Sequence, residues 1–241
     1  MSLTRRVALS LTFAISWGFC AAPAAADVPR HPPVEDFAGW PELSQPSLSP
    51  DGKRLASIQT YQGRQVIVIL TLDPPGQPPV VLPYKDGYIV GVNWANDNRI
   101  LITVNLHNRW WANDPASWYR VFSVDAKGEN GVMLLSDRTI HDPKDLTTPD
   151  LLIYNAATIV DPAPDDPDHI YMELRYYAKR GGYRDSVFRV DVNTGKSEPV
   201  VEGWSYTTGW VMDGHGHAVA RIDTTKKPFK DHLLIHTAND D

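Results

Sequence analysis

Residues 105–118 hold the most unusual combination of side chains in the sequence, NLHNRWWANDPASW. Arg109 can pair with a carboxylate, and Trp110 and Trp111 can stack on a side chain or a cation. These three residues are the candidates for contacting a peptide substrate. The alternative is that the tryptophans pack between structural units or cover a loop. Packing is also the expectation for three further tryptophans, Trp94, Trp204 and Trp210.

Two histidines, His215 and His217, flank Gly216. Residues i and i+2 of a strand share a face, so both imidazoles can reach one metal ion, with Asp213 as a third ligand. However, Asp213-Gly214 is typical of a tight turn, where this alternation does not hold. A solvated turn is therefore the preferred interpretation.

Three aspartates at 165, 166 and 168 also suggest a cation site, but the interleaved prolines favour a turn. The sequence thus predicts no metal site and no cofactor. Glu173 closes a strand pattern together with Arg175 and receives no role. Lys226 and Lys227 are interpreted as a solvated loop.

A serine nucleophile of the Gly-x-Ser-x-Gly type is missing from the sequence. The nearest segment, 203–207, reads GWSYT and lacks the final glycine. A nucleophile elbow also needs a helix after the serine, whereas residues 208–211 have the composition of a strand. Ser205 is therefore not a nucleophile, and no catalytic residue is predicted.

Composition narrows the possible classes of protein. The chain has 241 residues and a formal net charge of -6, which argues against a nucleic-acid partner held by phosphate contacts. Its single cysteine excludes a disulfide framework and a cysteine-based zinc site within one chain. The many prolines (20) and aromatic residues favour a turn-rich β protein.

Residues 1–26 have the pattern of a cleavable signal peptide. Arg5 and Arg6 precede an apolar run over residues 7–22, and Ala24-Ala25-Ala26 supplies the small residues of a cleavage site. The alternative is an uncleaved anchor, for which the run is short. Cleavage predicts a periplasmic or secreted protein, residues 27–241, without membrane contact.

The mature chain repeats a turn followed by a strand. The turns centre near residues 51, 96, 166 and 214, and the strands that follow them are 53–58, 99–104, 169–174 and 217–222. A second series of strands keeps nearly the same spacing, at 66–73, 119–125, 186–191 and 232–237. An insertion over residues 136–150 accounts for the longest step and is interpreted as a loop.

Repeats of this length with several strands each are typical of a β-propeller. A β-sandwich is the alternative, but it gives no reason for turn and strand to recur together. The expected fold is therefore all-β, a partial β-propeller of about four blades. No segment remains to close a ring, so we expect residues 27–241 to be an incomplete propeller domain.

Several segments resemble the start of exported bacterial peptidases of the prolyl oligopeptidase family, including dipeptidyl and acylaminoacyl peptidase-like members. The opening segments are PVEDFA (33–38) and LSQPSLSPDGKRLA (43–56). The later segments are VNWANDNRILI (92–102), PDDPDH (164–169) and FRVDVNTG (188–195). The resemblance covers essentially residues 33–241.

In that family a propeller accompanies an α/β-hydrolase domain with a Ser, Asp, His triad. The resemblance implies that the complete protein is a serine peptidase, and that this chain is its non-catalytic propeller portion, which gates access of peptide substrates. The hydrolase domain is missing from the chain and would be its partner. The alternatives are a stand-alone periplasmic binding propeller and a metal-dependent propeller enzyme using His215 and His217.

Overall fold

The computed structural model describes residues 41–107, 117–136, 155–156, 158–178 and 182–236. The predicted signal peptide and most of the predicted loop at 136–150 lie outside these residues. Within them the structure is all-β, with no helix and hence no helix long and apolar enough to cross a membrane.

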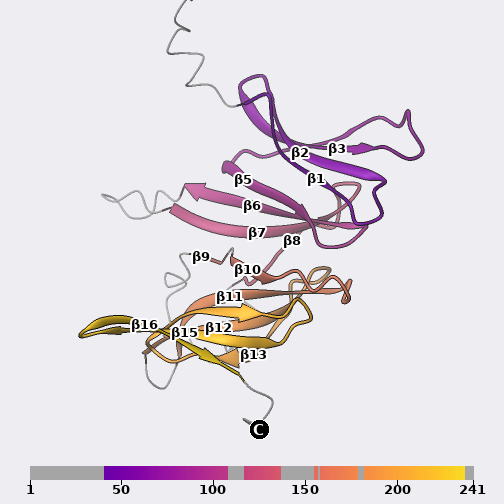
Figure 1. Cartoon of the computed structure of the whole chain (residues 1–241). Coiled ribbons are helices and arrows are strands. Elements are labelled where there is room, and N and C mark those ends of the chain that lie inside the picture. Colours follow the sequence, from indigo (N-terminus) through magenta and orange to yellow (C-terminus); the bar gives the residue numbers. More distant parts are fainter. Residues whose placement is uncertain (1–40, 108–116, 137–154, 157, 179–181, 237–241) are drawn as a thin grey trace, which may run out of the picture. The chain divides into compact units, whose positions relative to one another are not determined.

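The strands of the described residues form four sheets, numbered here in chain order (Figure 1). Sheet 1 contains β1 (Leu43–Leu48), β2 (Arg54–Tyr61), β3 (Arg64–Thr71) and β4 (Val80–Pro83). Sheet 2 contains β5 (Gly87–Trp94), β6 (Arg99–His107), β7 (Ser117–Asp125), β8 (Val132–Met133) and β9 (Asn155–Ala156). Sheet 3 contains β10 (Thr158–Asp161), β11 (His169–Ala178), β12 (Gly182–Asp191) and β13 (Ser197–Glu202). Sheet 4 contains β14 (Thr207–Met212), β15 (Ala218–Lys226) and β16 (Phe229–Ile235).

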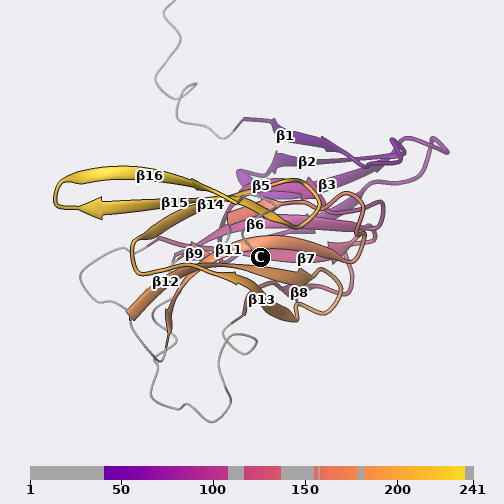
Figure 2. The same cartoon turned by 60° about the horizontal axis from the view of Figure 1, so that its bottom comes forward.

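Each sheet is an antiparallel meander in which consecutive strands are hydrogen-bonded neighbours. The short strand β9 is the exception, because it pairs in parallel with β7. Four successive meander sheets are the arrangement of propeller blades. The predicted partial β-propeller of about four blades is confirmed. Figure 2 shows the three strands of sheet 4 side by side, with β16 on the outside.

Both predicted series of strands are present. The strands expected after the turns are β2, β6, β11 and β15, and the second series is β3, β7, β12 and β16. Turn chemistry explains their starts, since Gly52 and Gly214 adopt φ values of +71° and +86° in the Asp-Gly turns. The strand expected at 232–237 begins earlier, at Phe229, because Lys226 pairs directly with Phe229 across the hairpin.

Alternation along the strands divides the apolar side chains between two cores. In β6, Ile100, Ile102 and Val104 belong to the core shared with sheet 1. Leu101 lies on the opposite face and belongs to the core shared with sheet 3, which also contains Met172 of β11. Sheet 2 is thus covered by its neighbours on both faces.

Tryptophan indoles join neighbouring sheets. Trp94 is buried and its Nε1 donates to the Ser47 carbonyl of sheet 1 at 2.9 Å. Trp210 repeats this contact, since its Nε1 donates to the Asp185 carbonyl of sheet 3 at 3.0 Å. The packing interpretation is confirmed for both. It is wrong for Trp204, which is 50% exposed and lies beneath the Arg184 guanidinium.

Arg99 is a buried polar link between sheets 2 and 3. Its side chain is 5% exposed, and its Nη2 donates to the Val192 carbonyl at 2.7 Å and the Ser123 carbonyl at 3.2 Å. Burial lowers the pKa of Arg99, while the charges of Asp125 and Asp191 oppose that shift. The guanidinium stays charged, and its positive charge strengthens the hydrogen bonds that it donates to the carbonyl oxygens at this junction.

Candidate functional site

The sequence-predicted substrate contacts, Arg109, Trp110 and Trp111, lie outside the described residues. The strands on either side are described, and His107 at the end of β6 pairs with Ser117 at the start of β7. The segment therefore connects the second strand of sheet 2 to its third, as expected. Its role in substrate binding stays a prediction.

The paired strands β11 and β12 of sheet 3 carry a group of ionisable side chains. We refer to Glu173, Arg175 and Asp185 as the carboxyl cluster. Glu173 and Arg175 share one face of β11, and the strand register places Asp185 of β12 opposite Arg175. The Arg175 Nη1 lies 3.1 Å from the Asp185 Oδ2, and the Asp185 side chain is 10% exposed.

Burial dominates the electrostatics of the carboxyl cluster. It raises the pKa of Glu173 to about 7, and the nearby charge of Asp185 adds to this shift. Burial also raises the pKa of Asp185, although the Arg175 guanidinium opposes the change. Glu173 therefore exchanges a proton near neutral pH. Such a group can accept a cation or transfer a proton, which is why perturbed carboxyls mark candidate sites.

Replacing Glu173 with glutamine is expected to change how stability depends on pH. The pKa of Glu173 in the folded chain, about 7, exceeds its ordinary value of 4.5. Between these values the folded state holds a proton that the unfolded state has lost, so this residue lowers the free energy of unfolding as pH rises from 4.5 to 7. In urea unfolding, the free energy of unfolding of Glu173→Gln should fall by about 2 kcal/mol less than that of the wild type over this interval.

The matched control is Glu129→Gln, since Glu129 is exposed in the turn after β7. This variant should follow the wild-type pH dependence. Equal slopes for wild type and Glu173→Gln between pH 4.5 and 8 would contradict the assigned proton uptake.

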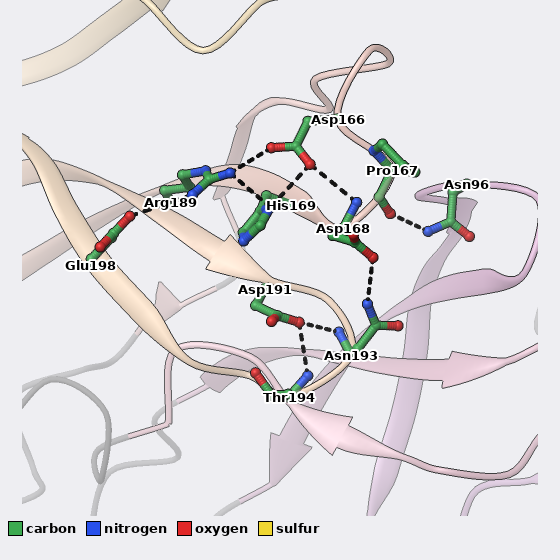
Figure 3. A network of polar contacts seen from close by, with 10 residues as sticks. All are labelled: Asn96, Asp166, Pro167, Asp168, His169, Arg189, Asp191, Asn193, Thr194 and Glu198. Atoms are coloured by element: carbon green, nitrogen blue, oxygen red, sulfur yellow. Dashed lines mark hydrogen bonds and ion pairs between the residues drawn. The ribbon is translucent and has the colours of Figure 1, made fainter.

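A second polar network surrounds the turn between β10 and β11 (Figure 3). The Asp166 carboxylate accepts hydrogen bonds from Arg189 Nη2 at 2.8 Å and contacts His169 Nδ1 at 3.0 Å. Burial alone would raise the pKa of Asp166, but the bonds from Arg189 and His169 outweigh it and lower the pKa to about 2. Asp166 is thus a permanently charged residue that holds the turn.

The same turn is tied to its surroundings on two sides. Asn193 Nδ2 donates to Asp168 at 2.9 Å, and Asn96 Nδ2, in the turn between β5 and β6, donates to the Pro167 carbonyl (Figure 3). The turn predicted at residues 165–168 is confirmed. Its aspartates 166 and 168 accept hydrogen bonds from the chain's own donors.

The two candidate histidines bond to different carboxylates. His215 Nδ1 lies 2.8 Å from Asp165, and His217 Nδ1 lies 2.9 Å from Asp213. Asp213 also accepts the backbone N–H groups of both histidines, and these bonds lower its pKa to about 2. Among the described ranges, no group of three His, Cys, Asp or Glu side chains is arranged to hold a metal ion.

Ser205 lies in the turn that joins β13 to β14. Strands precede and follow this turn, and no helix follows it, so the geometry of a nucleophile elbow is absent here. Gly203 has a different reason to be glycine. Its N–H donates to the Ser186 hydroxyl, and a Cβ added at this position would lie 2.1 Å from the Asp185 carbonyl oxygen.

Sequence patterns did not identify Asp185 or Arg99. Asp185 lies ten residues from Arg175, and Arg99 lies 93 residues from Val192. No local spacing rule connects Arg99 with Val192. The hairpin signal at residues 179–182, Lys-Arg-Gly-Gly, could have predicted the Arg175–Asp185 pair if the register had been assigned.

No family model and no curated protein matches the chain. Among solved structures, the propeller domain of the trilobed protease from Pyrococcus furiosus is similar, with a TM-score of 0.47 and 15% identity over 83% of this chain and 55% of that one. Acylaminoacyl peptidase from Pyrococcus horikoshii has a TM-score of 0.45 and 17% identity over 82% of this chain and 31% of that one. TolB from Acinetobacter baumannii has a TM-score of 0.40 and 14% identity over 83% of this chain and 45% of that one.

The present chain spans between about a third and about half the length of these proteins. The assignment of the fold rests on the four sheets described above, since identities of this size support nothing beyond a fold.

Proposed function

We propose that the chain is the propeller portion of an exported serine peptidase resembling the prolyl oligopeptidase family. The observation that carries the proposal is the order of its motifs along three consecutive blades, from SPDG at 49–52 in sheet 1 to FRVDVNTG at 188–195 in sheet 3. In this role the propeller filters peptides, and a separate α/β-hydrolase domain cleaves them. The leader pattern at residues 1–26 supports export to the periplasm or the medium.

Peptide hydrolysis by an acyl-enzyme route requires a nucleophile, a general base and an oxyanion hole. The sequence contains no Gly-x-Ser-x-Gly segment that would supply the first of these. The propeller therefore contributes binding and access, with Arg109, Trp110, Trp111 and the carboxyl cluster as the proposed contacts for peptides. Glu173 supports this assignment because a cationic group of a peptide, placed beside its buried carboxyl, would favour the charged carboxylate and pair with it.

The test combines the purified 241-residue chain with the native protein. The purified chain should neither hydrolyse a panel of fluorogenic peptides nor react with a fluorophosphonate probe. Native protein, captured from the source cells with an antibody against residues 41–107, should contain a fluorophosphonate-labelled polypeptide larger than 26.9 kDa.

Sequencing the gene beyond codon 241 provides an independent readout, because the proposal expects an in-frame Gly-x-Ser-x-Gly followed by Asp and His. Turnover by the purified chain above a mock-purified control would refute the non-catalytic role. A captured native protein without any labelled species would refute the peptidase and favour a stand-alone binding propeller.

A further inference from the structure

The turn between β7 and β8 holds the only Asn-Gly pair of the sequence, Asn130-Gly131. Both residues are exposed, and Asn130 has a φ of 52°, in the left-handed region that asparagine tolerates. In such a pair the side-chain amide carbon can form a five-membered ring with the next backbone nitrogen. Glycine has no Cβ to obstruct the closure of this ring. The pair is therefore a candidate for cyclisation.

The Gly131 nitrogen is available as the nucleophile. In the described part of the chain, its N–H donates none of the backbone hydrogen bonds of the turns and loops. The carbonyl of the same peptide group, that of Asn130, accepts a hydrogen bond from Arg99 Nη1 at 3.1 Å. A charged donor at this oxygen stabilises the negative charge that the peptide group carries once the N–H proton is lost. Arg99 thus favours the form of the peptide group that attacks.

One hydrogen bond restrains the Asn130 side chain. Its Nδ2 donates to Asp125 Oδ2 at 2.8 Å, and this bond is exposed. Water competes for such a bond, so the side chain can leave it at little cost in free energy. The other carboxylate oxygen of Asp125 accepts the N–H groups of Lys127 and Glu129. The turn therefore keeps these two bonds while the Asn130 side chain rotates.

We propose that Asn130 is a site of spontaneous deamidation in the folded chain. The Gly131 nitrogen loses its proton to solvent and attacks the Asn130 Cγ. The bond from Cγ to Nδ2 then breaks, and ammonia leaves with a proton from solvent. Water opens the cyclic imide at either of its carbonyls, which gives aspartate or isoaspartate. The net reaction consumes water and releases ammonia, and it does not depend on the proposed peptidase.

Either product alters the surroundings of Arg99. Burial would raise the pKa of Asp125, but hydrogen bonds from the Glu129 backbone and the Asn130 side chain outweigh it and lower the pKa. Asp125 is therefore charged, and aspartate at position 130 would place a second negative charge beside it. Isoaspartate adds a carbon to the backbone and displaces the carbonyl that Arg99 binds. We expect both products to weaken the link that Arg99 makes between sheets 2 and 3.

The experiment incubates the full chain under native conditions at about pH 7 and about pH 9, and peptide mass spectrometry follows each asparagine. Conversion at Asn130 should be faster at the higher pH, because the nucleophile is a deprotonated amide. Asn193 is the internal control. It is also exposed, and its Nδ2 also donates to an aspartate, Asp168 at 2.9 Å, but threonine follows it. Asn193 should convert about tenfold more slowly or less.

Gly131→Ala tests the ring closure in a folded chain. The nearest neighbour of an added Cβ would be Val124 Cγ1 at 3.5 Å, so the turn has room for it. The Cβ restricts the backbone conformations that cyclisation needs, and conversion at Asn130 should slow about tenfold or more. Circular dichroism shows whether the variant is folded.

The effect on the sheet junction is measured on incubated protein. Brief proteolysis in urea, near the unfolding midpoint, digests the less stable chains first. The surviving wild-type protein should therefore be enriched in unmodified Asn130. Incubated Gly131→Ala should resist proteolysis as well as the same variant before incubation.

Three results would overturn the proposal. The first is an Asn130 that converts no faster than Asn193 in the native chain. The second is equal conversion in the wild type and Gly131→Ala, because the ring would then not close at Gly131. The third is equal survival of converted and unmodified chains, which would show that the product leaves the Arg99 link intact.

Discussion

Replacing Arg99 with methionine should lower the free energy of unfolding by about 4 kcal/mol. Methionine preserves most of the apolar stem but removes every hydrogen bond of the guanidinium. The lost bonds include those to the carbonyls of Val192, Ser123 and Asn130, at 2.7 to 3.2 Å. Urea unfolding followed by tryptophan fluorescence measures the loss.

The large effect follows from burial on both sides of the junction. Val192 is 0% exposed, so water cannot replace the guanidinium at its carbonyl. A buried acceptor left without a donor lowers the free energy of unfolding by about 1–3 kcal/mol, and Arg99 donates to more than one carbonyl. Arg99→Lys should recover only part of the loss, because an ammonium cannot match the planar fork.

Arg54→Met is the matched control. Arg54 also donates to a carbonyl across a sheet junction, that of Asp97 at 2.7 Å, but this bond is exposed. Its loss should cost less than about 1 kcal/mol. If Arg99→Met destabilised the chain no more than Arg54→Met does, the link between sheets 2 and 3 would not depend on the guanidinium.

Replacing Gly203 with alanine should lower the free energy of unfolding by about 3 kcal/mol. An added Cβ would lie 2.1 Å from the Asp185 carbonyl oxygen and 2.8 Å from the Cβ of Thr207. The carbonyl is backbone and cannot rotate away like a flexible side chain. The same Asp185 carbonyl accepts the Trp210 indole N–H. A backbone shift that relieved the clash would therefore disturb the contact between sheets 3 and 4.

Gly91→Ala is the control for this substitution, because Gly91 also lies in a sheet but has space. The nearest atom to its added Cβ is the Thr103 Cβ at 3.9 Å, an ordinary contact. Its stability should stay within about 1 kcal/mol of the wild type. Thermal unfolding by circular dichroism compares the two, and equal melting temperatures would show that the backbone at Gly203 adjusts freely.

Local sequence determined the strands of this protein and their grouping. Short apolar runs between Asp-Gly and Asn-rich turns are sufficient to form hairpins, because positive φ at residues such as Gly52 and Gly195 depends on neighbours in the chain. The turn and strand signals then recur in the same order four times. For this reason the all-β class and the four blades were predictable, as were the packing roles of Trp94 and Trp210.

The candidate site was not predictable in the same way. Glu173 lies in the middle of β11, and its burial together with the charge of Asp185, which comes from the neighbouring strand, raises its pKa. Likewise, Trp204 resembles the packing tryptophans in sequence but is half exposed.

The sequence by itself therefore determined what each segment forms, since hairpin geometry is a property of adjacent residues. The tertiary structure decided which charged side chains are buried and which carbonyls accept hydrogen bonds from Arg99. It also determined that residues of β13 and of sheet 4 line one groove. These properties depend on residues far apart in the chain, such as Arg99 and Val192, because desolvation and Coulomb energies depend on distance in space.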